Sequence, residues 1–141
     1  MLHRLFQFLN SYSRNRDGAT AIEFALVAIP FLLIIFGVME GGRLVWSMNA
    51  VQYAVEETSR YAALNPDLST SAFQEYALDR LADMYVPGEA LTLSSSTVTS
   101  NGIDFVQVDG QYTYATMLGS FLPGDFGDFD FQSSVRKPLV E

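Results

Sequence analysis

The chain lacks cysteine altogether, and its 141 residues contain a single histidine, His3. Disulfide bonds, a thiolate nucleophile and cysteine-ligated metal sites are therefore excluded. A Ser-His-Asp triad or a histidine-bearing zinc motif would depend on His3 alone, at the extreme N-terminus, which argues against both. No acid, base and nucleophile stand at a diagnostic spacing elsewhere. The sequence therefore predicts no catalytic residue, no metal site and no cofactor.

Charged residues are also scarce, at 17% of the chain against about 25% in a typical soluble domain, whereas 49% of residues are hydrophobic. The formal net charge of −8 argues against a protein that binds nucleic acid by neutralising phosphates. This charge is unevenly spread, with a net +2 on residues 1–18 and a net −10 on residues 19–141. A basic leader therefore precedes a strongly acidic body.

A long apolar run begins where the charge changes sign. Sixteen residues from Phe24 to Met39 carry no charge, and the run lengthens to 21 residues when it is counted from Ala19. As a helix, 21 residues span about 31 Å, which matches a hydrocarbon core of about 30 Å. The alternative, a buried helix of a soluble protein, is disfavoured because the run is apolar on every side and the chain is short. We therefore predict a transmembrane helix over residues 19–40.

The flanking charges predict which way this helix points. Arg14 and Arg16 precede the span, whereas Glu40 and one early base, Arg43, follow it. By the positive-inside rule the N-terminus lies in the cytoplasm and the acidic body lies outside. A cleaved secretory signal is the competing interpretation, but its apolar region is usually about 7–15 residues long and ends in an A-x-A-like site. This run is longer and continues into a helical pattern without such a site.

Glu23 is the one charged residue of the predicted span before Glu40 at its end. A carboxylate costs about 2.5–3.5 kcal/mol at the centre of a bilayer and less near the interface. One interpretation is a solvated residue at headgroup depth, favoured by the positive end of the helix dipole. The other is a functional role, and position alone does not decide between the two.

The surrounding residues carry a family resemblance. The stretch RNRDGATAIEFALV, residues 14–27, resembles the processing region of type IV prepilins, in which a basic leader ends in glycine and a glutamate follows five residues later. More closely, it is similar to the TadE-like family of the Tad (Flp) pilus system. The similarity continues through Pro30, FGVME at 36–40, GRL at 42–44 and RYAA at 60–63, and so covers about residues 14–64. The C-terminal half resembles the family only in its general character. Gly41 stands where many members carry an aromatic residue.

The resemblance implies cleavage between Gly18 and Ala19 by a membrane-embedded aspartyl prepilin peptidase. Glycine suits a scissile position because it lets another backbone approach closely. Glu23 would become the fifth residue of the mature chain and, with Phe24, would act in assembly, its carboxylate pairing with the new amine of Ala19. The implied partners are the peptidase, other pilins or pseudopilins, inner-membrane pilus assembly proteins and the lipid bilayer. The implied location is the bacterial inner membrane or the pilus itself.

Beyond the span, an apolar stripe predicts that the helix continues outside the membrane over residues 41–64. The stripe consists of Leu44, Met48, Val51, Val55, Thr58 and Ala62. Pro66 ends the helix, because the residue before a proline is pushed out of helical conformation. Pro30 and the Gly41-Gly42 pair are the expected bend points. Gly37 and Gly41 form a small-xxx-small pair that predicts close helix packing at the outer membrane edge.

Residues 65–141 are expected to form a small extracytoplasmic α+β domain. A second helix is predicted from about Ala72 to Tyr85, with Ser71 and Gln74 as its capping box. After Gly88 the residues favour β-structure, with a hairpin turn at Asn101-Gly102 and a last strand between residues 128 and 135. Three or four antiparallel strands would bury one face against the helical stripe. The predicted fold class is thus α+β and pilin-like, with a long N-terminal transmembrane helix, a short second helix and a small antiparallel sheet.

Three aspartates near the last strand could bind calcium. Asp125, Asp128 and Asp130 supply the oxygen ligands that calcium prefers, but they lack the spacing of an EF-hand. An acidic surface loop is the favoured interpretation.

Two functions remain open on the sequence. The leading hypothesis is a non-catalytic minor pilin or pseudopilin of a Tad (Flp) apparatus, because the domain of about 75 residues after Leu64 is far more than a major pilin of that system carries. The alternative is an uncleaved single-span envelope protein with an acidic extracytoplasmic binding domain. Processing at Gly18 separates the two.

Overall fold

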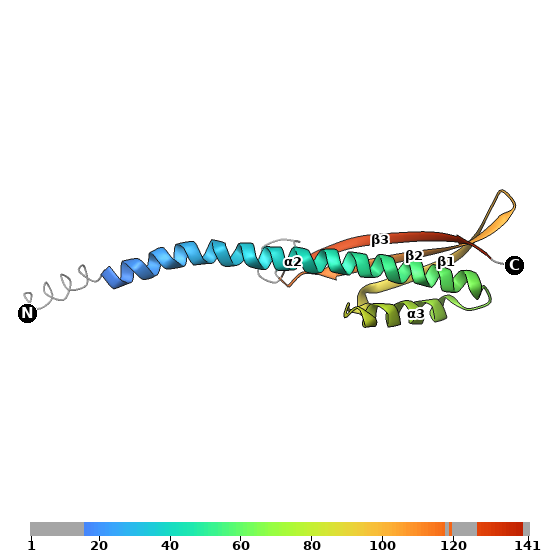
Figure 1. Cartoon of the computed structure of the whole chain (residues 1–141), viewed down its shortest axis with the longest axis horizontal. Helices are drawn as coiled ribbons and strands as arrows, with labels where there is room; N and C mark the ends of the chain where they lie inside the picture. The colour runs from blue at the N-terminus through green and yellow to red at the C-terminus, as the bar shows by residue number, and fades with distance from the viewer. Residues whose placement is uncertain (1–15, 118, 120–126, 140–141) are drawn as a thin grey trace, which may run out of the picture. The chain divides into compact units, whose positions relative to one another are not determined.

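The computed structural model describes residues 16–117, 119 and 127–139 (Figure 1). The chain divides into an N-terminal unit, Met1–Met39, and a C-terminal unit, Glu40–Glu141. Helix α2, Arg16–Leu64, is 49 residues long and contributes residues to both units. The two units are therefore described one at a time.

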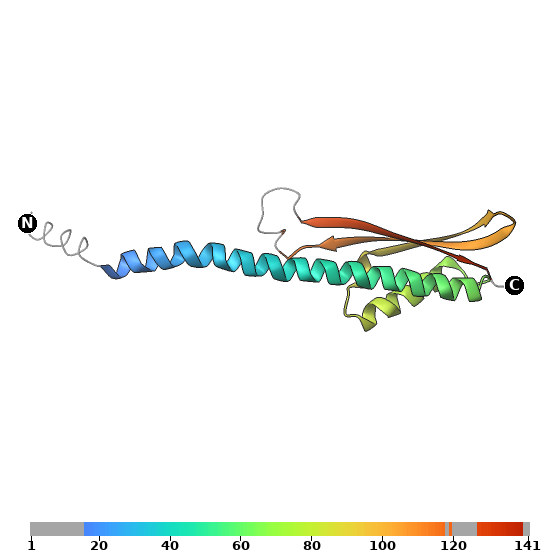
Figure 2. The same ribbon diagram turned by 45° about the horizontal axis from the view of Figure 1, so that its top comes forward.

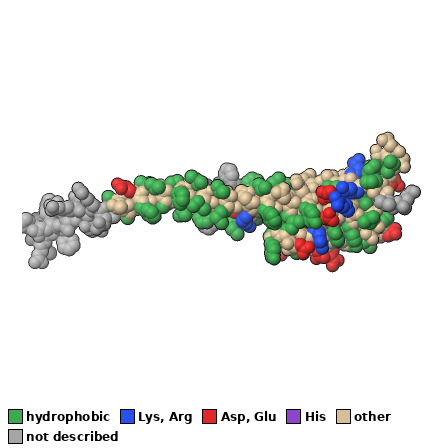
Figure 3. Space-filling model, in the orientation of Figure 1, with side chains coloured by type: hydrophobic (Ala, Val, Ile, Leu, Met, Phe, Trp, Pro, Cys, Tyr) green, Lys and Arg blue, Asp and Glu red, His purple; other side chains and the backbone are tan. Residues whose placement is uncertain are grey.

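In the N-terminal unit, α2 presents apolar side chains to its surroundings on every side. All residues from 18 to 39 are exposed except Ala28, which is partly buried, and hydrophobic side chains cover this stretch in Figure 3. The helix is long and apolar enough to cross a membrane, by length and composition. A single N-terminal helix of this kind fits a single-pass membrane protein. Pro30 lies inside the helix, and the bend expected there stays a prediction.

The C-terminal unit contains the rest of α2, a second helix and a three-stranded sheet. Helix α3 is Thr70–Asp83, and the short 3₁₀ helix η1 is Gly88–Ala90. The strands are β1, Leu91–Ser100, β2, Ile103–Ala115, and β3, Asp128–Pro138, paired antiparallel in the order β1-β2-β3. The predicted α+β, pilin-like fold class is confirmed, with three of the three or four expected strands.

The turn between β1 and β2 forms where the sequence predicts it. Asn101 and Gly102 have φ angles of 53° and 77°, and Ser100 pairs with Ile103 across the two-residue connection. Two consecutive positive φ angles are what a tight hairpin of this type requires, and Asn-Gly is the dipeptide that adopts them most readily. The local sequence therefore sets the register between β1 and β2.

The start of α3 differs from the prediction. The helix begins at Thr70, and its N-cap is Ser69, whose Oγ accepts a hydrogen bond of 3.4 Å from the amide of Ala72. The expected cap, Ser71, lies inside the first turn. Three hydroxyl residues in succession can each cap a helix, so sequence alone selects the wrong one. The helix also ends at Asp83 rather than at Tyr85.

Gln74 serves the sheet rather than the predicted capping box. Its Nε2 donates to the carbonyl oxygen of Leu91 at 2.7 Å, and its Oε1 accepts from the amide of Leu93 at 2.8 Å. The side-chain amide thus satisfies backbone groups on the open edge of β1, as a neighbouring strand would. This contact fixes α3 to the sheet.

The core lies where α2 and α3 pack against one face of the sheet. In two views, α2 and α3 run side by side (Figures 1 and 2). The predicted stripe is confirmed, because Val51, Val55, Thr58 and Ala62 are fully buried and the remaining two members, Leu44 and Met48, are partly buried. Alternate residues of the strands complete the core: Leu91, Leu93, Val106, Val108, Tyr112 and Tyr114. This alternation is the expected pattern for an antiparallel sheet with one buried face.

Gly110, in the middle of β2, lies directly against α2. A Cβ atom placed on Gly110 would lie 2.5 Å from Cγ2 of Val55 and 3.2 Å from Cδ2 of Leu93. Val55 is stiff at χ1 and fully buried, so it has little freedom to move aside. The absence of a side chain in the middle of β2 therefore allows the helix to seat on the sheet.

We expect Gly110→Ala to lower the free energy of unfolding of the C-terminal unit by about 1–3 kcal/mol, the usual cost of overpacking a core. Gly42→Ala is the matched control, because a Cβ there would meet nothing within 4 Å, and replacing a helical glycine is neutral or stabilising. Urea unfolding of the detergent-solubilised chain, followed by circular dichroism, measures both. Equal urea midpoints for Gly110→Ala and the unsubstituted chain would show that α2 can shift without loss of stability.

Candidate functional site

The predicted cleavage position lies on α2, near the start of the described residues. Gly18 and Ala19 are both helical, and both are exposed. A Cβ placed on Gly18 would meet nothing within 4 Å. The residues on both sides of the Gly18–Ala19 bond are thus exposed.

The two predicted assembly residues follow one turn later. Glu23 is exposed, and Phe24 has 73% of its surface exposed. Glu23 lies four residues after Ala19, a rise of about 6 Å along the helix, and it is the only charged residue between positions 18 and 39. The structure therefore places a lone carboxylate close to the residue that cleavage would make the N-terminus.

The predicted packing pair, Gly37 and Gly41, is open. At each glycine a Cβ atom would meet nothing within 4 Å. Within the described part of the chain, then, no other segment packs closely against either position. The role of this pair in helix packing stays a prediction.

A carboxylate that the sequence analysis noted only in passing organises the start of the C-terminal unit. Oε1 of Glu40 accepts hydrogen bonds from the hydroxyl of Tyr114 and from the amide of Met117, each at 3.0 Å. Oε2 accepts from Nη1 of Arg43 at 3.2 Å. Only 14% of the Glu40 side chain is exposed. Glu40 therefore joins α2 to the end of β2 and the residues that follow it.

The neighbouring tyrosines are donors at neutral pH. Burial and the hydrogen bond to Glu40 raise the pKa of Tyr114 above 10, although the Arg43 guanidinium, 5.8 Å from the ring centroid, opposes this. Burial likewise raises the pKa of Tyr112, whose hydroxyl donates to the carbonyl oxygen of Pro87 at 3.1 Å. Both phenols keep their protons at neutral pH, so they serve as structural donors.

We expect Glu40→Ala to destabilise the C-terminal unit by about 1–3 kcal/mol, because it leaves the Tyr114 hydroxyl and the Met117 amide without their acceptor. Glu56→Ala is the matched control. Glu56 also lies on α2 and pairs with Arg60 and Lys137, but 47% of its side chain is exposed, and exposed pairs contribute about 0–1 kcal/mol. Thermal unfolding in detergent compares the two, and equal losses would contradict the special role of Glu40.

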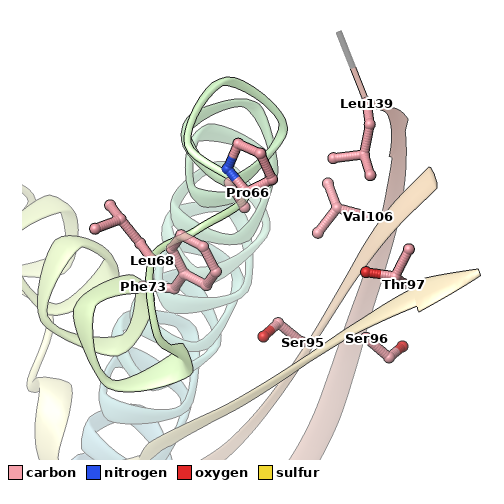
Figure 4. A pocket seen from close by; sticks show the side chains of 9 residues that line it. Pro66, Leu68, Phe73, Ser95, Ser96, Thr97, Val106 and Leu139 are labelled. Carbon is pink, nitrogen blue, oxygen red and sulfur yellow. The ribbon is translucent and has the colours of Figure 1, made fainter. Parts of the chain in front are cut away.

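A pocket of about 140 Å³ opens between the end of α2, α3 and the sheet (Figure 4). Its walls are apolar side chains and the hydroxyl residues of β1: Ala62, Pro66, Leu68, Phe73, Ser95, Ser96, Thr97, Val106 and Leu139. As far as the described residues line it, the pocket carries no carboxylate, imidazole or amine, the groups that most acid–base chemistry uses.

The predicted acidic loop is only partly described. Asp125 lies outside the described residues. Asp128 and Asp130 both lie on β3, and Oδ1 of Asp130 accepts from the hydroxyl of Thr113 at 2.7 Å. Among the described residues, no group of three or more histidine, aspartate or glutamate side chains could hold a metal ion.

Comparison with known proteins agrees with the first part of this description. A family model described as TadE-like protein matches residues 18–60, and so begins at Gly18 and includes Glu23 and Glu40. This is the family that the sequence resemblance indicates. Neither a curated protein nor a solved structure matches the chain.

Proposed function

We propose that this TadE-like chain is a non-catalytic minor pilin or pseudopilin of a Tad (Flp) pilus or a related secretion apparatus. The observation that carries the proposal is the TadE-like match over residues 18–60, on a helix whose membrane-length segment is unburied. An exposed apolar helix with one carboxylate near its start is suited to packing among similar helices in a bilayer. The work of the protein is assembly, and its partners are other pilus proteins.

The C-terminal unit supports a minor role rather than that of the bulk subunit. It has its own core on two helices and a sheet, and so contributes a folded body beyond the apolar helix. A filament built from many copies of this chain would have to accommodate the folded C-terminal unit in every subunit. With an initiating or accessory subunit, the unit occurs only once or a few times.

Processing is the finer part of the proposal. A prepilin peptidase removes residues 1–18 by cutting the Gly18–Ala19 bond, and the mature protein stays in the inner membrane with its C-terminal unit outside the cytoplasm. The support is the Gly18 and Glu23 spacing, the basic leader, and the exposure of Gly18 and Ala19.

Intact-mass measurement of the membrane protein tests this proposal. In cells that contain the peptidase, the mass should correspond to a chain that begins at Ala19, and in cells without it to the full chain. Retention of residues 1–18 in the presence of an active peptidase would refute processing. It would favour the second candidate, an uncleaved single-span envelope protein whose acidic unit binds a partner.

A further inference from the structure

An unusual residue, Tyr85, follows the end of helix α3. Tyr85 has a positive φ of 57°, and its amide donates to the carbonyl oxygen of Ala82, while the amide of Val86 donates to that of Leu81, each at 3.0 Å. These two bonds form a Schellman motif, in which the left-handed residue is normally glycine. Val86 and Leu81 are both buried apolar residues, and an apolar contact between these two positions often accompanies the motif. The backbone thus favours glycine at the position where the chain has tyrosine.

The Tyr85 side chain does not compensate for this conformation by packing. It is 96% exposed, although large aromatic side chains are usually buried at least in part. A bulky residue in a conformation that suits glycine is a local outlier, and such outliers point to a function outside the fold itself. Tyr85 is therefore suited to contact something that the isolated chain does not contain.

Trp46 stands at the same end of the C-terminal unit. Its Nε1 donates to the carbonyl oxygen of Met84, the residue before Tyr85, at 3.1 Å. The hydrogen bond fixes the indole ring, yet Trp46 remains 58% exposed. Trp46 on α2 and Tyr85 after α3 are thus both exposed aromatic residues, and the hydrogen bond links Trp46 to the backbone of the residue before Tyr85. We call Trp46 and Tyr85 the aromatic surface.

The position of Trp46 on α2 indicates what this surface meets. Trp46 lies six residues after Glu40, the first charged residue beyond the apolar run, which is about 9 Å of helix rise. Side chains on a helix tilt toward its N-terminus, which shortens that distance for the indole ring. The headgroup layer on each side of a bilayer is about 5–8 Å thick. Arg43, 44% exposed and one turn earlier, adds a cation that suits lipid phosphate.

We propose that the aromatic surface rests in the headgroup layer of the membrane that α2 crosses. This inference rests on the proposed function, because it requires α2 to span a bilayer. Tryptophan and tyrosine favour the membrane interface, since each has an apolar ring and a polar group. A lipid interface is the favoured occupant because the surface follows directly on the membrane-length helix. Tyr85, 45 residues further along the chain than Glu40, reaches the lipid only because α3 returns to Trp46.

The single tryptophan of the chain makes a direct test available. The full chain is reconstituted in phosphatidylcholine vesicles that contain lipids brominated on the acyl chains near the glycerol, and quenching of tryptophan fluorescence is measured. Three single-tryptophan chains are compared. These are the unsubstituted chain, Trp46→Phe with Tyr85→Trp, and, as the matched control, Trp46→Phe with Tyr53→Trp. Tyr53 is exposed and lies on α2 two turns beyond Trp46.

We expect bromine to lower the emission at positions 46 and 85 at least twofold and to leave position 53 nearly unchanged. Circular dichroism establishes that the substituted chains fold as the unsubstituted chain does. An alkaline wash shows whether the chain is inserted in the vesicles. If an inserted chain shows no quenching at position 85, the inference is overturned and the proposed function stands. If bromine does not quench the emission at position 85 but aqueous acrylamide does, the residue faces water. The surface would then be assigned to a protein partner. Equal quenching at position 53 also overturns the inference, whereas loss of the chain from the vesicles overturns the membrane span as well.

Discussion

Gly18→Leu should leave the leader attached to the chain in cells that contain the prepilin peptidase. The unsubstituted protein should lose residues 1–18 under the same conditions. The expected effect is near-complete loss of processing, because a peptidase that cuts beside glycine needs its catalytic groups to approach the backbone closely. A branched side chain at the scissile position keeps the two apart.

The open surroundings of Gly18 argue against a fold defect as the cause. A Cβ at Gly18 would meet nothing within 4 Å, so a side chain there starts in open space. Leucine also favours helix more than glycine does, by somewhat less than about 1 kcal/mol. It therefore makes the helix around Gly18 slightly harder to unwind, which acts in the same direction as the steric effect.

Gly37→Leu is the matched control for this experiment. Gly37 lies in the same helix, is equally open, and stands 19 residues after Gly18. Its replacement should leave cleavage intact, and intact-mass measurement of both variants reads the result. Normal removal of the leader from Gly18→Leu would show that the peptidase tolerates a side chain there, or that it cuts elsewhere.

The elements that sequence reasoning predicted correctly are those whose signals are local. The stripe on α2 repeats every three to four residues, and the Asn101-Gly102 turn is encoded by two adjacent residues with positive φ angles. One hairpin and one amphipathic helix then dictate most of the layout, because the buried faces have only each other to pack against. Expected boundaries were less accurate, as the shift of the α3 cap from Ser71 to Ser69 illustrates.

The contacts that sequence reasoning missed join residues far apart in the chain. Glu40 and Tyr114 are 74 residues apart, and Gln74 binds backbone groups of β1 that carry no sequence signal of their own. The left-handed Tyr85 was missed for a related reason, since Gly88 nearby supplied a more obvious end for the helix. Such contacts depend on which segments the fold brings together, and periodicity does not report that.

Glu23→Gln should insert into the membrane normally but fail to join the pilus complex. We predict that the Glu23 carboxylate pairs with the Ala19 amine that cleavage exposes. The two residues are about 6 Å apart along one helix, so within a single chain the carboxylate bends back only partway. A neighbouring chain displaced along the axis can bring its amine alongside. The pair therefore favours one axial register between subunits.

The expected size of the effect follows from the surroundings of this pair. Residues 24–39 carry no charge and are almost wholly exposed on α2, so packed neighbours would enclose the pair in apolar side chains. Removing one partner of a buried ion pair leaves the other charge uncompensated, at about 3–5 kcal/mol. That is enough to lower association by more than a hundredfold, because each 1.4 kcal/mol is a factor of ten.

Co-purification of each variant with its pilus partners is the measurement. Glu23→Asp should be partly defective, because its carboxylate is one methylene shorter. Glu56→Gln is the matched control, since it removes the charge from an exposed carboxylate on the same helix, in the C-terminal unit. This control should assemble normally. If Glu23→Gln is recovered with its partners at the level of the unsubstituted chain, then Glu23 is only a solvated residue at the membrane edge, and the helix N-terminus rather than a neighbouring subunit accounts for its presence.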